Sequence, residues 1–120
     1  MNADEWKRAI RRATKAAGTY KKQFDAPIDA LAKILDQRDR VYQEFLDGGA
    51  EAVIVRVSDR GARNSGKNPL LTLWMELNRD ALAYWRELGL TPSGLKKLND
   101  AAMQGAKEQT ALEKALAQLT

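Results

Sequence analysis

The chain has 120 residues, 44% hydrophobic and 30% charged, which is enough for one folded domain but too few for two with separate cores. It has no cysteine and no histidine, which excludes disulfide bonds, thiolate or imidazole metal ligands, and catalytic triads that need either residue. No apolar run approaches the roughly 20 residues of a membrane span, and the acidic N-terminal residues lack the apolar segment of a signal peptide. We therefore expect a soluble intracellular protein with no membrane partner.

The net charge of +4 is unevenly distributed along the chain. Residues 1–24 carry seven bases and two acids, and residues 56–67 carry four bases and one acid. Between them, residues 25–55 carry three bases and seven acids, while residues 68–120 are balanced. An anionic partner is therefore expected at two places on the chain.

The first helix is predicted to begin after Asn2, which can cap it, and to end near Gly18. Trp6 and Ile10 mark its apolar side. Four bases share the other side at i, i+3, i+4 and i+7, namely Arg8, Arg11, Arg12 and Lys15. Such a face is either solvated or in contact with phosphates, and four bases without interleaved acids favour phosphates.

A connector at residues 18–24 precedes the second helix. Its aromatic residues, Tyr20 and Phe24, are expected to anchor it to the core, although aromatic rings also stack on the bases of single strands. Asp25 can cap the second helix, which is predicted to run to Asp47 and to stop at the following glycine pair. Its apolar stripe is interrupted by arginine at position 38.

The third helix has the strongest boundary signals in the chain. Asn68 is a good N-cap, Pro69 suits the first helical position, and Gly89 follows the last apolar residue. Apolar residues at spacings of three and four form one stripe, on which we expect the other elements to pack: Leu70, Leu73, Trp74, Leu77, Ala81, Tyr84, Trp85 and Leu88. Two long amphipathic helices with a short insertion between them predict an antiparallel pair.

The insertion at residues 52–66 contains alternating valines, Val53, Val55 and Val57, which predict a strand. Asp59 to Gly61 can turn the chain, so we expect either a small β-hairpin or a mobile basic loop. A hairpin needs support from the helices or a neighbouring subunit, and its edge strand can pair with a second copy.

Thr91-Pro92 repeats the cap-and-proline signal and predicts a short helix that reaches about Leu98. Residues 99–120 are weakened by Gly105 and carry a narrow stripe of Leu112, Leu116 and Leu119. We expect a frayed C-terminal helix there, or a tail that becomes ordered on a partner.

Paired carboxylates are the catalytic option that the composition leaves open. The pairs are Asp25 with Asp29 and Asp36 with Asp39, each on one helix face. A magnesium nuclease needs several convergent carboxylates in a cleft, and here three neighbouring bases predict surface ion pairs instead: Lys33, Arg38 and Arg40. The sequence also has no nucleotide-binding P-loop, so we expect no enzymatic activity and no cofactor.

The order of these signals resembles the small terminase subunit of tailed bacteriophages, in the short form found in many siphophages and prophages. The resemblance covers roughly residues 18–98. It is carried by GTY…F at Gly18–Phe24, the long helix after Pro27, the basic insertion, and then KNPLL and LGLTPSGLKKL. Its most specific parts are Asn68-Pro69 and the run from Leu88 to Pro92. The order of these two motifs and their separation along the chain indicate the family.

The resemblance implies a role in DNA packaging in the cytoplasm of the bacterial host. Small terminase subunits bind double-stranded viral DNA and recruit the large subunit, which holds the ATPase and the nuclease, and they have no catalytic residues of their own. They typically assemble as rings, often of about eight to ten subunits. This chain lacks the separate helix-turn-helix domain of larger members, so DNA binding outside the ring, along its rim and through its channel all stay open.

These inferences predict a mainly α fold: a long antiparallel helix pair, a basic N-terminal helix, a small β-hairpin or loop insertion, and a short C-terminal helix in a ring-forming oligomer. Its parts are a basic helix and connector (1–24), a helical-hairpin oligomerisation core (25–98) with the hairpin at 52–66, and a C-terminal helix or tail (99–120). The predicted DNA-binding residues are Lys7, Arg8, Arg11, Arg12, Lys15, Lys21, Lys22, Arg56, Arg60, Arg63 and Lys67.

Two other functions stay open from the sequence. One is a small helical DNA-binding regulator or nucleoid-type protein that acts as a dimer, and the other is a scaffolding protein whose charges only keep it solvated. Subunit number separates the regulator from the ring, and binding of duplex DNA at low salt separates the scaffold from both.

Overall fold

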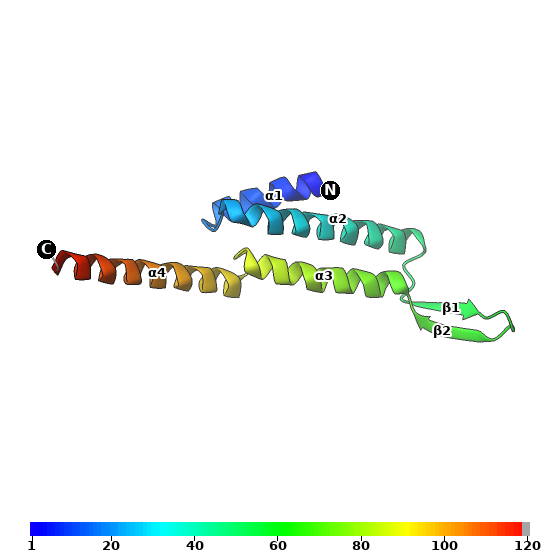
Figure 1. Ribbon diagram of the computed structural model, residues 1–120. Helices are drawn as coiled ribbons and strands as arrows, with labels where there is room; N and C mark the ends of the chain where they lie inside the picture. Colours follow the sequence, from blue (N-terminus) through cyan, green and yellow to red (C-terminus); the bar gives the residue numbers. More distant parts are fainter. Residues whose placement is uncertain (119–120) are drawn as a thin grey trace.

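The computed structural model describes residues 1–118 and is mainly helical, as predicted (Figure 1). Over these residues it contains four α-helices, one 3₁₀ turn and a two-stranded antiparallel sheet. In chain order these are α1 (Ala3–Ala16), the 3₁₀ turn η1 (Lys22–Phe24), α2 (Asp25–Asp47), β1 (Val53–Val57), β2 (Arg63–Lys67), α3 (Pro69–Glu87) and α4 (Pro92–Gln118).

The antiparallel pair of α2 and α3 is confirmed, but α2 is the helix around which the others are arranged (Figure 1). It contributes six buried side chains, against two from within α3, because α1 packs on one side of it and α3 on another. The core joins Ile10 of α1 to Leu31 and Leu35 of α2 and to Ala81 of α3. The expectation that the other elements pack on the α3 stripe is therefore wrong, and Trp74 within that stripe is only half-buried.

The predicted helix ends are confirmed where a local capping signal defines them. The Asn2 side chain accepts the Glu5 N–H at 2.9 Å, and the Asn68 side chain accepts the Leu70 N–H at 3.0 Å. At the end of α3, Gly89 has φ +71°, a left-handed conformation that glycine adopts without steric cost, and the Leu90 N–H reaches the Trp85 carbonyl at 2.9 Å.

The prediction that Asp25 caps α2 is wrong. The turn η1 leads directly into the helix, so Phe24 is the N-cap and makes no side-chain capping bond. Asp25 is already helical, and its carboxylate is bonded to Arg11 and Tyr20 instead. Tertiary partners therefore compete successfully for a side chain that the sequence suggests as a cap.

The hairpin forms as predicted, with Val53 paired to Lys67 and Val57 paired to Arg63. Side chains alternate across a strand, so Val53, Val55 and Val57 share one face of the hairpin. All three valines are exposed, because the hairpin projects beyond the ends of α2 and α3 (Figure 1).

The C-terminal region differs from the prediction of a short helix followed by a frayed helix or tail. A single helix, α4, runs for 27 residues from Pro92 to Gln118 and passes through Gly105 without a break. One interior glycine costs a helix only about 1 kcal/mol, and most residues of this segment are good helix formers. Leu119, the last leucine of the predicted stripe, lies outside the described residues.

The described chain is long and thin, with principal extents of 87 × 27 × 21 Å. The hairpin and α4 project from opposite ends of the helical body (Figure 1). Within residues 1–118, no helix is both long and apolar enough to cross a membrane.

Candidate nucleic-acid interface

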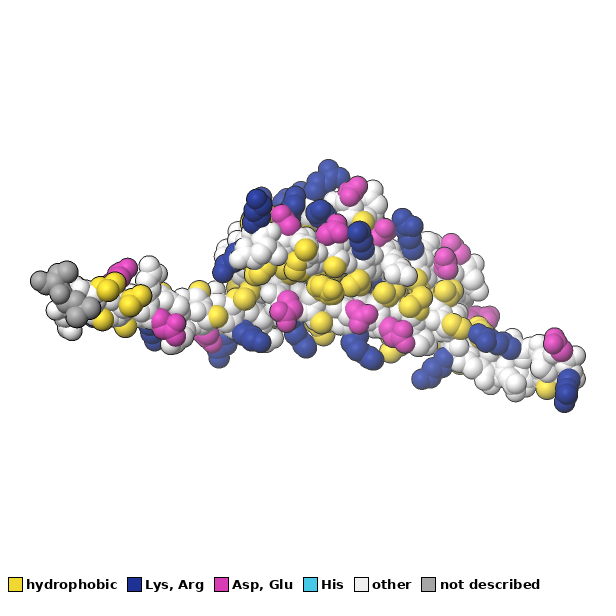
Figure 2. Space-filling model, in the orientation of Figure 1, with side chains coloured by type: hydrophobic (Ala, Val, Ile, Leu, Met, Phe, Trp, Pro, Cys, Tyr) yellow, Lys and Arg dark blue, Asp and Glu magenta, His cyan; other side chains and the backbone are white. Residues whose placement is uncertain are grey.

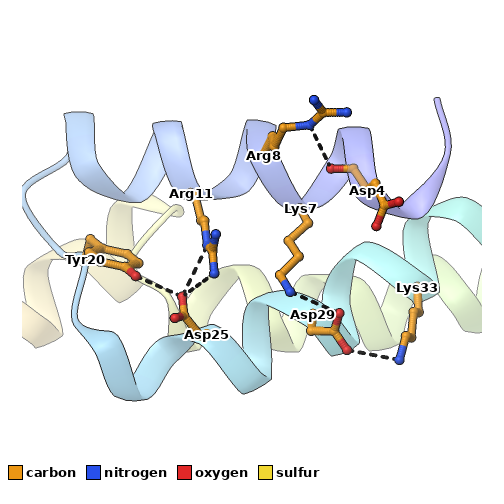
Figure 3. A network of polar contacts seen from close by, with 8 residues as sticks. All are labelled: Asp4, Lys7, Arg8, Arg11, Tyr20, Asp25, Asp29 and Lys33. Atoms are coloured by element: carbon orange, nitrogen blue, oxygen red, sulfur yellow. Dashed lines mark hydrogen bonds and ion pairs between the residues drawn. The ribbon is translucent and has the colours of Figure 1, made fainter.

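Two of the predicted DNA-binding residues in α1 are engaged with α2 (Figure 3). The Lys7 ammonium lies 3.5 Å from the Asp29 carboxylate, and the Arg11 guanidinium lies 3.2 Å from the Asp25 carboxylate. Both bases lie on the side of α1 that meets α2, so they hold the two helices together. The predicted basic face of α1 is thereby divided, and Arg11 is separated from its neighbours.

The contact between α1 and α2 lowers the pKa values of the two acids in it, Asp25 and Asp29. The hydrogen bond from the Tyr20 hydroxyl, 2.9 Å long, and the nearby Arg11 charge lower the pKa of Asp25. The Lys33 ammonium at 3.0 Å, followed by Lys7, lowers the pKa of Asp29. The same hydrogen bond raises the pKa of Tyr20 above 10.0, because ionised Tyr20 could no longer donate to Asp25.

The remaining bases of α1 face solvent. Arg8 donates to the backbone carbonyl of Asp4, at 3.4 Å, and its guanidinium points away from α2 (Figure 3). Arg12 is exposed and has no ion pair within residues 1–118, and the Lys15 ammonium lies over the Tyr20 ring, 5.0 Å from its centre. Arg8, Arg12 and Lys15 follow one another at i, i+4 and i+7, and we call them the outer face of α1. Lys21 and Lys22, in the connector beside it, are exposed as well.

The second basic cluster lies on the hairpin. All four bases are exposed, and none forms an ion pair with a described carboxylate: Arg56, Arg60, Arg63 and Lys67. The strand register places Arg63 and Lys67 on the valine face and Arg56 on the opposite face, while Arg60 lies in the turn. A shallow concavity on the hairpin has both Arg56 and Lys67 in its lining.

The two basic clusters remain separate within one copy of the chain. Hairpin residues project past the C-terminal end of α2, whereas α1 packs along the N-terminal part of that helix (Figure 1). Basic side chains also gather over α1 on the face shown in Figure 2. Within residues 1–118 of one copy, the two basic clusters therefore form two separate small surfaces.

Comparison with known proteins decides the family. A model of the family described as phage terminase, small subunit, matches residues 3–105, which is most of the chain. The chain belongs to the phage terminase small-subunit family. No curated protein and no solved structure matches it.

Small terminase subunits are generally non-catalytic, and in this member the candidate catalytic carboxylates are engaged with bases. The predicted ion pairs are confirmed, with contacts of 3.0 Å in Lys33–Asp29, 2.9 Å in Arg38–Asp39 and 3.1 Å in Arg40–Asp36. Within the described residues, no group of three or more potential ligands is placed to hold a metal ion.

One polar cluster of this terminase subunit was not foreseen from its sequence. The Trp6 indole N–H donates to the Asp39 carboxylate at 2.9 Å, and the Arg38 guanidinium lies over the Trp6 ring, 5.6 Å from its centre. Arg38 also donates to the Asn78 side chain at 3.4 Å, so the cluster links α1, α2 and α3. The sequence signal for this cluster is Arg38, the arginine that interrupts the apolar stripe of α2.

Proposed function

We propose that this chain is the non-catalytic, DNA-binding adaptor of a phage packaging machine. It binds double-stranded viral DNA in the cytoplasm of the bacterial host and recruits and regulates the large terminase subunit, which supplies the ATPase and nuclease. The observation that carries this proposal is the family match over residues 3–105, and the exposed bases on two surfaces, which form no ion pair within residues 1–118, agree with it.

The DNA contact is proposed to use mainly the bases that face solvent. Lys7 and Arg11 would have to give up ion pairs with Asp29 and Asp25 in order to reach phosphates. The outer face of α1, the connector lysines and the hairpin arginines need no such exchange. A phosphate contact made by these residues breaks no ion pair within residues 1–118 and releases the counterions of the phosphates.

The working form is proposed to be a ring of about eight to ten subunits. One copy presents two small basic clusters, which is a weak site for duplex DNA. Repetition around a closed ring makes the later contacts intramolecular, so overall affinity rises without new residues. Each neutralised phosphate adds about −0.9 to the slope of log K against log salt, so binding is expected to depend steeply on salt.

The test compares two variants that lose the same number of charges. Arg8→Ala/Arg12→Ala removes two exposed bases from the outer face of α1, and Lys107→Ala/Lys114→Ala removes two exposed bases from α4 as a matched control. Duplex DNA binding is measured by fluorescence anisotropy at several salt concentrations, and subunit number by light scattering. We expect the first variant to bind more weakly with a shallower salt slope, and the control to behave as wild type.

Other outcomes point elsewhere. Equal affinity of both variants and wild type would move the DNA contact to the hairpin, where Arg56→Ala/Arg60→Ala is the next variant. No binding by the wild type at low salt would favour a scaffold, and a stable dimer that binds DNA would favour a regulator.

A further inference from the structure

One face of the hairpin carries two polar side chains that have no partner within residues 1–118. The strand register pairs Arg56 with Asn64 on the face opposite the valines, and both residues are exposed. Neither side chain forms a hydrogen bond or an ion pair with another described residue. Side chains directly opposite each other on paired strands have Cβ atoms about 4.5–5.5 Å apart, so these two can contact one ligand together. We call Arg56 and Asn64 the polar pair.

The position beside the polar pair is open to a ligand. Gly66 follows Asn64 by two residues and so shares its face of the hairpin, opposite Ile54. A Cβ at Gly66 would meet no atom within 4 Å, so the packing of the chain does not require glycine there. Glycine within a strand often marks the close approach of a ligand. Gly66 also lines the hairpin concavity together with Arg56 and Asn64, so another molecule can approach the polar pair closely.

Hydrogen bonds hold the hairpin at both of its ends. At the base, the Asn68 N–H donates to the Ala52 carbonyl at 2.9 Å, and the Asn68 side-chain amide donates to the Glu51 carbonyl at 3.0 Å. Because Asn68 also caps α3, the hairpin is tied to the start of that helix. At the tip, the Ser58 N–H donates to the Ala62 carbonyl at 2.8 Å. The hairpin therefore presents the polar pair in a defined orientation, away from the helical body (Figure 1).

The charge and the width of the hairpin suit the major groove of duplex DNA. Residues 53–67 contain four bases and one acid, so the hairpin is attracted to phosphates. Paired strands lie about 4.8 Å apart, and the major groove, which is about 12 Å wide, admits a two-stranded ribbon. In that groove, arginine bonds two acceptors of guanine, and asparagine bonds a donor and an acceptor of adenine. Successive base pairs are about 3.4 Å apart, so the two side chains of the polar pair can reach neighbouring base pairs.

We propose that the hairpin enters the major groove as a two-stranded ribbon, in which Arg56 contacts the edge of a guanine and Asn64 contacts the edge of an adenine on a neighbouring base pair. This inference rests on the DNA-binding role in the proposed function and names the residues that select a sequence. The outer face of α1 contacts phosphates, which increases affinity but does not distinguish one sequence from another. Arg63 lies on the valine face of the hairpin and is assigned to phosphates as well.

The test selects bound sequences from a pool of random duplex DNA. Wild type, Arg56→Ala, Asn64→Ala and Arg63→Ala are each equilibrated with the pool, and the bound duplexes are sequenced. Arg56→Ala and Arg63→Ala each remove one charge from an exposed strand position, so they are matched in charge but lie on opposite faces. We expect wild type to enrich a motif in which a guanine and an adenine occupy neighbouring base pairs.

The variants are expected to change this motif in different ways. Arg56→Ala should lower the preference for guanine at one position at least about fivefold, and Asn64→Ala should do the same for adenine at the neighbouring position. Arg63→Ala should keep the motif and weaken binding to all sequences alike, because it loses a phosphate contact. A motif lost in Arg63→Ala but kept in Arg56→Ala would place the base contacts on the valine face and contradict the proposal.

A second measurement identifies the groove. Replacing the selected guanine with 7-deazaguanine removes its N7 acceptor from the major groove and leaves its pairing with cytosine intact. We expect this duplex to bind wild type about fivefold more weakly than the unmodified duplex, and to bind Arg56→Ala as well as the unmodified duplex does. Equal binding of both duplexes by wild type would exclude the contact between Arg56 and guanine in the major groove.

The outcomes separate this inference from the function on which it rests. A wild type that binds DNA but enriches no motif would overturn base recognition by the hairpin, and so would a motif that both Arg56→Ala and Asn64→Ala leave intact. In either case the adaptor would still bind DNA through its phosphate contacts. A wild type that binds no duplex even at low salt would overturn the DNA-binding role and this inference together.

Discussion

Thr19 is a buried hydroxyl that joins the connector after α1 to the end of α3. Its Oγ1 donates to the Leu88 carbonyl oxygen at 3.0 Å, and the residue is 7% exposed. Thr19→Val keeps the shape but leaves that carbonyl without its donor, so we expect the free energy of unfolding in urea to fall by about 1–2 kcal/mol. Thr110→Val is the control, because the Thr110 hydroxyl bonds the carbonyl of Ala106 within its own exposed helix. Similar losses at both positions would contradict this assignment.

The carboxylates of Asp25 and Asp29 make the contact between α1 and α2 sensitive to acid. Their partners hold both pKa values below the ordinary 3.8, so their stabilisation is complete above that pH and is lost as the pH falls through the lowered values. We expect the free energy of unfolding of the wild type to exceed that of Asp25→Asn/Asp29→Asn at neutral pH. The difference is expected to shrink below pH 3.8, as measured by urea denaturation across the pH range. A difference that does not change with pH would show that these ion pairs do not stabilise the fold.

At the scale of elements, the junction between α3 and α4 depends on Gly94. A Cβ at this position would clash with the Arg86 backbone, whereas a Cβ at Gly105 would meet no atom within 4 Å. We expect Gly94→Ala to lower the free energy of unfolding by roughly 1–3 kcal/mol, because α4 must move away from α3. The same change at Gly105 is expected to stabilise by up to about 1 kcal/mol, since alanine favours a helix more than glycine does. Chemical denaturation followed by circular dichroism measures both, and effects of equal sign would contradict the proposed close approach at Gly94.

The helix ends that could be predicted from the sequence are those that neighbouring residues along the chain determine. Caps at Asn2 and Asn68 and the glycine after Leu88 act within one turn of helix, so their residues alone indicate the ends. The role of Asp25 and the central place of α2 depend on which helices pack together, and the sequence pattern does not contain that information. The unbroken α4 differs from the prediction for another reason, because one interior glycine at Gly105 costs only about 1 kcal/mol and does not end a helix of good helix formers.

The sequence indicates that the candidate DNA surface is basic, but it does not indicate which of its basic residues face solvent and which form ion pairs. Arg11 and Arg12 are adjacent in the sequence, yet one is paired with Asp25 and the other faces solvent. Their different roles follow from the way α1 lies on α2, which the spacing of basic residues does not fix. Helical spacing alone therefore placed Arg11 with Arg8 and Lys15, from which the structure separates it.

At the scale of the whole molecule, the shape of the chain is not that of a self-contained globule. Its radius of gyration is 22.4 Å, whereas a compact chain of this length would have about 13–14 Å. The apolar side chains left exposed are large, including Val55, Val57, Leu112 and Leu116, and they occur at both ends. A rod with so much uncovered apolar surface is expected to gain stability when copies associate.

Assembly should therefore appear in the thermal stability of the protein. If the folded chain is stabilised by neighbouring copies and the unfolded chain is not, mass action raises the unfolding midpoint with protein concentration. For a ring of several subunits, each tenfold increase in concentration adds about 1.2–1.4 kcal/mol per subunit, which corresponds to roughly 3–6 °C for a chain of this size. Scanning calorimetry from micromolar to hundreds of micromolar protein measures this shift. A midpoint that stays constant over this range would mean that a single copy holds its fold unaided, because only a concentration-independent equilibrium behaves in that way.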